Sequence, residues 1–180
     1  MTIVEFADFE CPYCAKQHKV LHELLKRYPK RLRLVFKHSP QSFHKNALAA
    51  ANAGAYANSQ GRFWAFAQRA FIHQSGLNSK SLSAHIAATG LNGEKAVSAI
   101  ERQGFSKQIA IDQADAAASG AIGTPHLFIN GRKIAGFRNE SVLSAIIEEE
   151  IKKANVLLSQ GISANKLYKK IIEAGKKRQT

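Results

Sequence analysis

The sequence contains little cysteine and no long hydrophobic run. Of its 180 residues only two are cysteines, Cys11 and Cys14, and only two residues separate them. A disulfide between them would close a loop too short to add much stability through chain entropy, so a chemical role is predicted for the pair. No apolar run approaches the roughly 20 residues that span a bilayer, and no secretory leader precedes the first strand-like segment. We therefore expect a soluble chain that carries no targeting signal.

Acidic residues are also scarce, with 13 Asp and Glu against 26 Lys and Arg, which gives a net charge of +13. Such a charge can indicate nucleic-acid binding, because basic patches release counterions from phosphates. The basic residues are spread over predicted helices, however, and no nucleic-acid-reading motif accompanies them, so no nucleic-acid partner is expected. Solubility, or attraction to acidic partners and membrane surfaces, explains the charge more simply.

The hydrophobic pattern changes its period several times along the chain. Residues 2–9 are rich in β-branched and aromatic side chains, residues 12–28 place apolar side chains at helical spacing, and residues 31–37 alternate. These segments predict a strand, a helix and a second strand. The next stretch, residues 43–119, is rich in alanine and lacks proline, which indicates several packed helices.

The last third of the chain has two clear local signals. Asn130-Gly131 lies between two short apolar runs and predicts a two-residue hairpin turn. Asn139 is a predicted N-cap for the helix that follows. We therefore expect an α/β domain over residues 1–155, with a helical insertion at about residues 41–119 between a βαβ half and a ββα half. Residues 156–180 are predicted to form a basic amphipathic helical tail, capped by Ser163, that packs against the body; the sequence leaves the oligomeric state open.

Cys11-Pro12-Tyr13-Cys14 lies where the first strand leads into the first helix. Cys11 is therefore expected near a helix N-terminus, where unpaired backbone N–H groups favour a thiolate. The thiolate is the species that attacks disulfides, and a sulfur of low pKa also leaves readily. Pro12 suits the first helical turn because no hydrogen bond from its nitrogen is needed there. Glu10 would oppose the thiolate if its carboxylate pointed toward the sulfur.

A zinc site is the main alternative for the two cysteines. Cys11, Cys14, His18 and His22 offer suitable ligand types, but one helix rotates them progressively apart, so no metal is expected. His18 is assigned no catalytic step, and no cofactor is expected. A second motif supports a redox pair: Gly123-Thr124-Pro125 immediately precedes a later strand, and an X-Pro bond can adopt the cis form.

FADFECPYC, the alanine-rich helical block and GTPHLFING together resemble the DsbA-like branch of the thioredoxin superfamily over about residues 2–151. The resemblance implies a thioredoxin-like fold in which Cys11 is the exposed nucleophile and Cys14 its buried partner. It also implies that Pro125 is cis and that Thr124 and Pro125 hold a substrate segment against Cys11. Glu5 and Lys37 are expected to form a buried proton-transfer pair beneath Cys14, the alternative being two strand-end charges that reach solvent.

Two departures bear on the function. Members of the family generally carry a secretion signal, which suggests that the chain is an excised domain or a processed protein. Thr124 also resembles the residue found in isomerases and reductases, where oxidases often have an apolar one.

The leading interpretation is an extracytoplasmic, periplasmic-type oxidase of protein thiols that a membrane partner or a small disulfide reoxidises. The alternatives are a disulfide isomerase or reductase, and a non-catalytic redox-sensing domain fused to a membrane protein. A glutaredoxin-like enzyme fits the large helical insertion less well.

Overall fold

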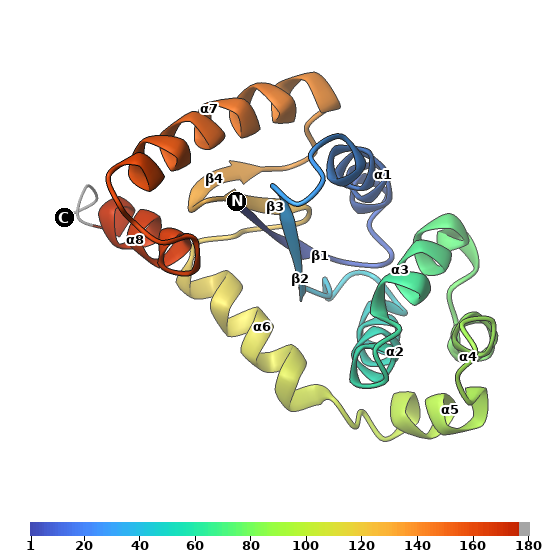
Figure 1. Cartoon of the computed structure of the whole chain (residues 1–180). Helices are drawn as coiled ribbons and strands as arrows, with labels where there is room; N and C mark the ends of the chain where they lie inside the picture. Colours follow the sequence, from blue (N-terminus) through green and yellow to red (C-terminus); the bar gives the residue numbers. More distant parts are fainter. Residues whose placement is uncertain (177–180) are drawn as a thin grey trace.

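The computed structural model describes residues 1–176, so Lys177 and Arg178 of the predicted basic tail lie outside the described residues. The elements follow one another along the chain in this order (Figure 1): β1 Thr2–Ala7, α1 Pro12–Arg27, β2 Arg33–His38, α2 Ala47–Ser59, α3 Phe63–Ile72, the short 3-10 helix η1 Gln74–Gly76, α4 Ser79–Ala87, α5 Gly93–Glu101, α6 Ser106–Ala118, β3 His126–Ile129, β4 Arg132–Ala135, α7 Glu140–Ser159 and α8 Ala164–Lys176. The predicted thioredoxin-like order of a βαβ half, a helical insertion and a ββα half is confirmed.

The four strands form one mixed sheet in the order β2-β1-β3-β4. β1 is parallel to β2 and antiparallel to β3, and β4 is antiparallel to β3. The β3–β4 connection is the predicted two-residue turn: Asn130 and Gly131 have φ angles of 48° and 86°, a left-handed conformation that asparagine and glycine tolerate best.

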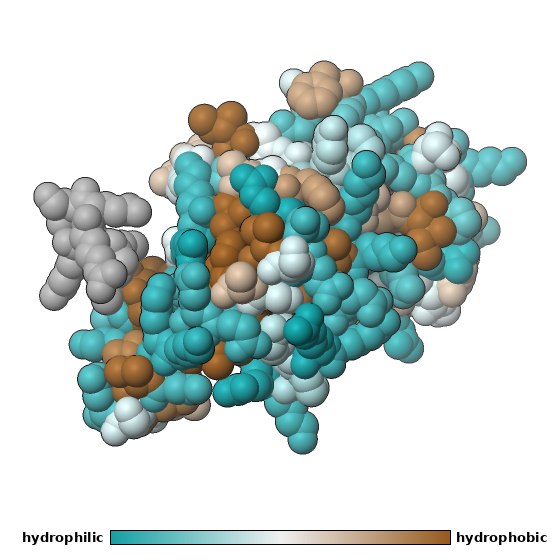
Figure 2. All heavy atoms as spheres, turned by 90° about the horizontal axis from the view of Figure 1, so that it is seen from above, coloured by the Kyte–Doolittle hydropathy of each residue, from teal (hydrophilic) through white to brown (hydrophobic). Residues whose placement is uncertain are grey.

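Helices cover both faces of the sheet, with α1 and α7 on one face and α6 on the other (Figure 1). The core under α1 and α7 joins buried side chains of both helices to Ile3, Leu127 and Ile129 of the sheet. The predicted cap of α7 is confirmed, because the Asn139 side chain accepts a hydrogen bond from the N–H of Val142. Seen from the side of α7, the surface is mostly hydrophilic and carries separate hydrophobic patches (Figure 2).

A second core connects the helical insertion to the start of α1. Phe9, which follows β1, is 1% exposed, and its ring centroid lies 5.4 Å from that of Phe66 and 5.0 Å from that of Phe71. Cys11 and Cys14 belong to the same buried cluster. The insertion therefore forms one wall of the cysteine turn.

The boundary expected after residue 155 falls inside α7, which continues without a break to Ser159. The turn at Gln160 to Ser163 separates α7 from α8, so the terminal helix begins at Ala164. None of the described helices is both long and apolar enough to cross a membrane.

The close approach of α2 to the cysteine turn makes Gly54 a sensitive position. Glycine to alanine inside a helix usually stabilises it by about 1 kcal/mol. At Gly54, however, a Cβ atom would lie 2.9 Å from both His38 Cε1 and Phe9 Cε2. We expect Gly54→Ala to destabilise the protein by about 1–3 kcal/mol in urea unfolding, because two packed rings must move. Asn58→Ala, at an exposed position of the same helix, is the control and is expected to be neutral or stabilising; an equally neutral Gly54→Ala would contradict the packing described.

Candidate functional site

The cysteine turn begins where β1 ends. Cys11 is the N-cap residue of α1, with extended backbone angles of φ −75° and ψ 118°, and Pro12 opens the first turn. Both cysteines are free thiols. Cys11 is 5% exposed and Cys14 is fully buried. Cys11 is therefore the more exposed cysteine, as expected, but it is itself largely buried. Tyr13 is 56% exposed beside them, and Lys16 Nζ lies 5.4 Å from its ring centroid.

The surroundings of the Cys11 sulfur favour a negative charge. A hydrogen bond with the Cys14 side chain is the largest influence and lowers the pKa of Cys11 to about 5, against the opposing effect of burial. Hydrogen bonds with the Thr124 side chain and with the backbone N–H groups of Cys14 and Tyr13 lower this pKa further. The sulfur thus receives the first-turn N–H groups that its place at the helix N-terminus predicts.

Cys14 has the opposite environment. Burial raises the pKa of the Cys14 thiol far above its ordinary value, and the neighbouring Cys11 and Glu5 raise it further. The backbone N–H of Asp8 is a weak opposing influence, donating to the Cys14 sulfur at 3.5 Å. One thiol of the pair is therefore easily ionised and the other stays protonated.

The Gly123-Thr124-Pro125 loop lies against Cys11. The Cys11 thiol donates to the Thr124 carbonyl oxygen at 3.3 Å. The peptide bond between Thr124 and Pro125 is cis, and Gly123 has a φ of +71°. Segments 113 residues apart in the sequence thus meet at the sulfur, as the family resemblance implies.

Glu10 does not oppose the thiolate, because its carboxylate points toward the start of α2. Its two oxygens accept from the backbone N–H and the side-chain amide of Asn46, the N-cap residue of that helix, at 2.5 and 2.9 Å. Asp8 is used similarly: it accepts from Gln41 N and His44 Nδ1, each at 2.8 Å. Both carboxylates near Cys11 therefore anchor the segment between β2 and α2.

The expected pairing of Glu5 with Lys37 is wrong. Glu5 lies opposite Phe36 in the register of β1 with β2, whereas Lys37 lies opposite Phe6, so the two side chains point to opposite faces of the sheet. Lys37 Nζ donates to Asp112 at 2.9 Å and to Asp115 at 2.7 Å, both on α6. The sequence prediction missed this pair of acceptors because they lie in the distant helical insertion.

The Glu5 carboxyl makes no such ion pair within the described residues. It is fully buried, and neither carboxyl oxygen has a hydrogen-bond partner within the described residues. Burial raises the pKa of the Glu5 carboxyl to about 8. A charge on Glu5 raises the pKa of Cys14, so the two groups are coupled electrostatically.

The histidines that follow Cys14 pack against aromatic rings. The rings of His18 and His22 lie 4.2 Å apart between centroids, and His18 also lies 4.7 Å from Phe71. Burial, with a smaller contribution from His22, lowers the pKa of His18 to about 3. Among residues 1–176, no group of three His, Cys, Asp or Glu side chains is arranged to hold a metal ion.

Gln74 is a site residue that the sequence analysis missed. It belongs to η1, in the helical insertion, and its side-chain Nε2 donates to the carbonyl oxygens of Phe9 and Cys11, each at 2.7 Å. The insertion is thereby tied to the backbone that carries the Cys11 sulfur. A glutamine in a polar turn gives no local signal of such a contact, because its partners lie more than 60 residues earlier in the chain.

Residues 1–149 match the family model described as Thioredoxin. The chain belongs to the thioredoxin family. Among curated proteins, this thioredoxin-family chain is 32% identical over 148 residues to the Na(+)/H(+) antiporter NhaA of Herminiimonas arsenicoxydans. That match covers 82% of the chain but only 24% of the antiporter, so the chain spans about a quarter of this relative's length.

Solved structures show the same fold. A thioredoxin-like oxidoreductase from Silicibacter pomeroyi DSS-3 superposes with a TM-score of 0.75 at 28% identity, covering 84% of the chain and 86% of that structure. BdbD from Bacillus subtilis gives a TM-score of 0.77 at 22% identity, with coverages of 84% and 87%. α-DsbA1 from Wolbachia pipientis gives 0.72 at 22% identity, with coverages of 87% and 88%. The fold is therefore that of DsbA-type members of the thioredoxin family.

Gln74 is expected to act through the backbone of the cysteine turn. Gln74→Met keeps the length of the side chain but removes both donors, so the Cys11 carbonyl dipole is less neutralised and the thiolate less favoured. We expect the pKa of Cys11, followed by the ultraviolet absorbance of the thiolate, to rise, and the free energy of unfolding to fall by about 1–3 kcal/mol. Gln68→Met, at an exposed position of α3, is the matched control. An unchanged Cys11 titration in Gln74→Met would refute the positioning role.

The raised pKa of the buried Glu5 carboxyl should make the free energy of unfolding depend on pH. This carboxyl has an ordinary pKa of 4.5 but titrates at about 8 in the folded protein, so the folded state binds more protons between these values. The contribution of Glu5 to stability therefore falls as pH rises from about 4.5 to 8. In urea unfolding of the disulfide form, where no thiol titrates, Glu5→Gln is expected to gain stability relative to the unsubstituted protein across this range. Glu94→Gln, at an exposed position, should run parallel to the unsubstituted protein; parallel behaviour of Glu5→Gln would show that Glu5 ionises normally.

Proposed function

We propose that the chain is a thiol-disulfide oxidoreductase that donates a Cys11–Cys14 disulfide to protein thiols, in the manner of a DsbA-type oxidase. The observation that carries this proposal is the unequal environment of the two sulfurs. Hydrogen bonds lower the pKa of Cys11 to about 5, while burial raises that of Cys14. A stabilised Cys11 thiolate stabilises the reduced pair, which makes the disulfide a stronger oxidant.

The proposed reaction proceeds through two exchanges. A substrate thiolate attacks Cys11 of the disulfide, the Cys11–Cys14 bond breaks, and a mixed disulfide forms between the substrate and Cys11. Cys14 leaves with the electron pair and takes up a proton. A second substrate thiolate then attacks the substrate sulfur of the mixed disulfide and releases Cys11 as a thiolate. The substrate gains a disulfide, and the protein is left with two reduced cysteines.

Two neighbours support these steps. Glu5, protonated up to a pH of about 8 and buried beneath the pair, is suited to supply the proton that Cys14 takes up as it leaves. The cis Thr124–Pro125 segment borders the sulfur, where its backbone can bind the substrate chain beside Cys11. Lys37, held by Asp112 and Asp115, has no part in this proposal.

The partners and the location belong to the same proposal. The substrates are thiol-containing proteins, and a membrane partner or a small disulfide reoxidises the pair after each cycle. A periplasmic or other extracytoplasmic location fits an oxidase, because disulfides persist in oxidising compartments. The periplasmic thioredoxin-like protein of Salmonella enterica, which gives a TM-score of 0.70 at 21% identity, shares the fold.

The antiporter relatives favour a second candidate. The region similar to this chain makes up only 24% of the Herminiimonas antiporter and 22% of that of Salinispora arenicola, so these relatives contain a thioredoxin-like part beside a much larger one. In such an arrangement the cysteine pair would sense redox conditions rather than process substrates. A reductase or isomerase using the same residues is the remaining alternative, and Thr124 beside Cys11 is the residue that favours it.

The reduction potential of the pair discriminates these functions. Equilibration in glutathione buffers, read by thiol labelling, is expected to give a potential well above the roughly −270 mV of thioredoxin. The oxidised protein should also oxidise a reduced, unfolded protein over many turnovers with glutathione disulfide present. A potential near that of thioredoxin would favour the reductase, and a high potential without turnover would favour the sensor.

Two cysteine variants test the order of events. Cys11→Ser is expected to abolish exchange. Cys14→Ser cannot form the Cys11–Cys14 disulfide and should lose oxidase activity, but its Cys11 thiolate should still attack a substrate that already carries a disulfide and remain in the resulting mixed disulfide, because no Cys14 thiol is present to displace the substrate. If Cys11→Ser formed this mixed disulfide while Cys14→Ser did not, the assignment of the nucleophile would be reversed.

A further inference from the structure

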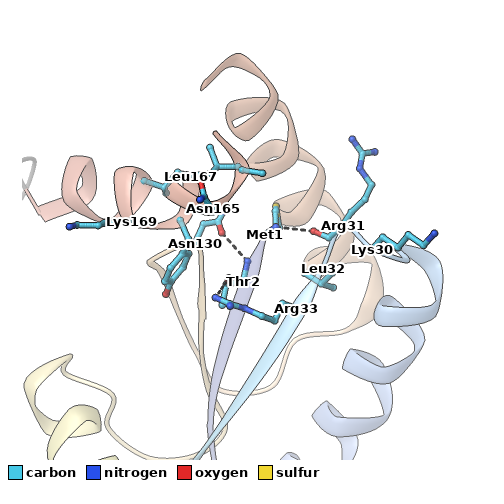
Figure 3. A pocket seen from close by; sticks show the side chains of 13 residues that line it. Met1, Thr2, Lys30, Arg31, Leu32, Arg33, Asn130, Asn165, Leu167 and Lys169 are labelled. Atoms are coloured by element: carbon cyan, nitrogen blue, oxygen red, sulfur yellow. Dashed lines mark hydrogen bonds between the residues drawn. The ribbon is translucent and has the colours of Figure 1, made fainter. Parts of the chain in front are cut away.

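A cavity of about 390 Å³ lies at the end of the sheet where β1 and β2 begin (Figure 3). Cys11 follows the other end of β1, so this cavity is separate from the cysteine turn. Four segments that are distant in the sequence form its walls: the start of β1, the turn between α1 and β2, the β3–β4 turn, and the first turns of α8.

The charged side chains that line this cavity are all basic. They are Lys30, Arg31, Arg33 and Lys169, and no Asp or Glu is among the described lining residues. Arg33 is held in place, since its guanidinium donates to Thr2 Oγ1 at 3.0 Å and lies 5.7 Å from the ring centroid of Tyr168. Lys30, Arg31 and Lys169 extend outward from the rim (Figure 3). The ion pair of Lys169 with Glu173 is long, at 3.9 Å.

Neutral donors complete this basic rim. Asn130 lines the cavity and is 6% exposed; its Oδ1 accepts from Thr2 N at 3.1 Å, while its Nδ2 has no partner within the described residues. A buried amide without an acceptor is unfavourable, and a bound acceptor would remove that cost. Ala164 and Asn165, the first residues of the 13-residue helix α8, also line the cavity, and first-turn N–H groups have no acceptor within their own helix.

We propose that this cavity, called here the α8 pocket, binds the phosphate group of a small anionic ligand. A phosphate accepts hydrogen bonds from several directions at once, which matches donors arriving from the β3–β4 turn, the start of α8 and the basic rim. Arginine in particular pairs with phosphate through its planar fork of donors. The helix N-terminus adds a favourable dipole. A volume of about 390 Å³ admits a phosphate with a few attached carbon atoms.

Glycerol phosphate is the probe for the α8 pocket. In NMR titration of the full chain, it is expected to shift the side-chain amide of Asn130 and the backbone amides of Ala164 and Asn165. The double variant Arg31→Gln/Lys169→Gln should bind at least about tenfold more weakly, because it removes two basic side chains that can form charge-assisted hydrogen bonds with the phosphate. The control Lys95→Gln/Lys107→Gln removes the same charge from exposed positions of α5 and α6 and should bind like the unsubstituted protein.

Two sources could supply such a phosphate, and vesicles distinguish them. If vesicles of phosphatidylglycerol, but not of phosphatidylcholine, bind the protein and displace glycerol phosphate, the pocket takes a lipid headgroup. If glycerol phosphate binds and vesicles do not compete, the ligand is a soluble phosphate ester. The proposal is overturned if neither probe shifts Asn130, or if the control variant loses as much affinity as the pocket variant. Thiol exchange at Cys11 should be unchanged in both variants, so failure here leaves the proposed redox function untouched.

Discussion

The backbone of Cys11 is the point on which the three parts of the chain depend. Its N–H donates to Asp8 O within the turn after β1 at 3.1 Å, and its carbonyl accepts from Gln74 of the helical insertion. Its sulfur donates to Thr124, just before the ββα half. Together these contacts help hold the Cys11 sulfur beside the first-turn N–H groups of α1. The chemistry of the pair is therefore a property of the assembled domain, and a CxxC on an isolated strand and helix would not reproduce it.

The second constraint is that nearby carboxylates must not destabilise the Cys11 thiolate. In this fold each of them has another role or is uncharged. Asp8 and Glu10 are fully used as acceptors for the segment that leads into α2. Glu5 lies deeper, where burial raises its pKa to about 8, so at neutral pH most of it is uncharged. Three acids within six residues of the sulfur are thus compatible with a Cys11 pKa of about 5.

The sequence predicts the architecture well because its signals are local. The change of hydrophobic period, the Asn130-Gly131 turn and the Asn139 cap each depend on a few adjacent residues, and all three appear in the structure. The family resemblance adds the meeting of Cys11 with Thr124, which spacing alone would not specify. The wrong predictions concern side chains that could point to either of two faces of an element. The pairing of Glu5 with Lys37 failed because a shift of one residue in register reverses the face of the sheet.

The contact of Gln74 with Cys11 and the ion pairs of Lys37 with α6 were beyond prediction for a related reason. Each joins the thioredoxin-like core to the helical insertion, and no periodicity relates the two. The domain was expected to end at residue 155, but α7 continues to Ser159, whereas the last helix, expected to be capped by Ser163, does begin at Ala164.

The large positive charge and the cysteine chemistry are largely independent. β1 has six residues, and at about 3.3 Å per residue it separates the α8 pocket from the cysteine turn by about 20 Å. This exceeds the screening length of about 8 Å at physiological ionic strength, so the basic rim has little effect on Cys11. The influences on the pKa of Cys11 agree, since they are burial and hydrogen bonds and include no charged side chain. The net charge of +13 therefore affects which partners the protein attracts, whereas short-range contacts determine the pKa of the Cys11 thiol.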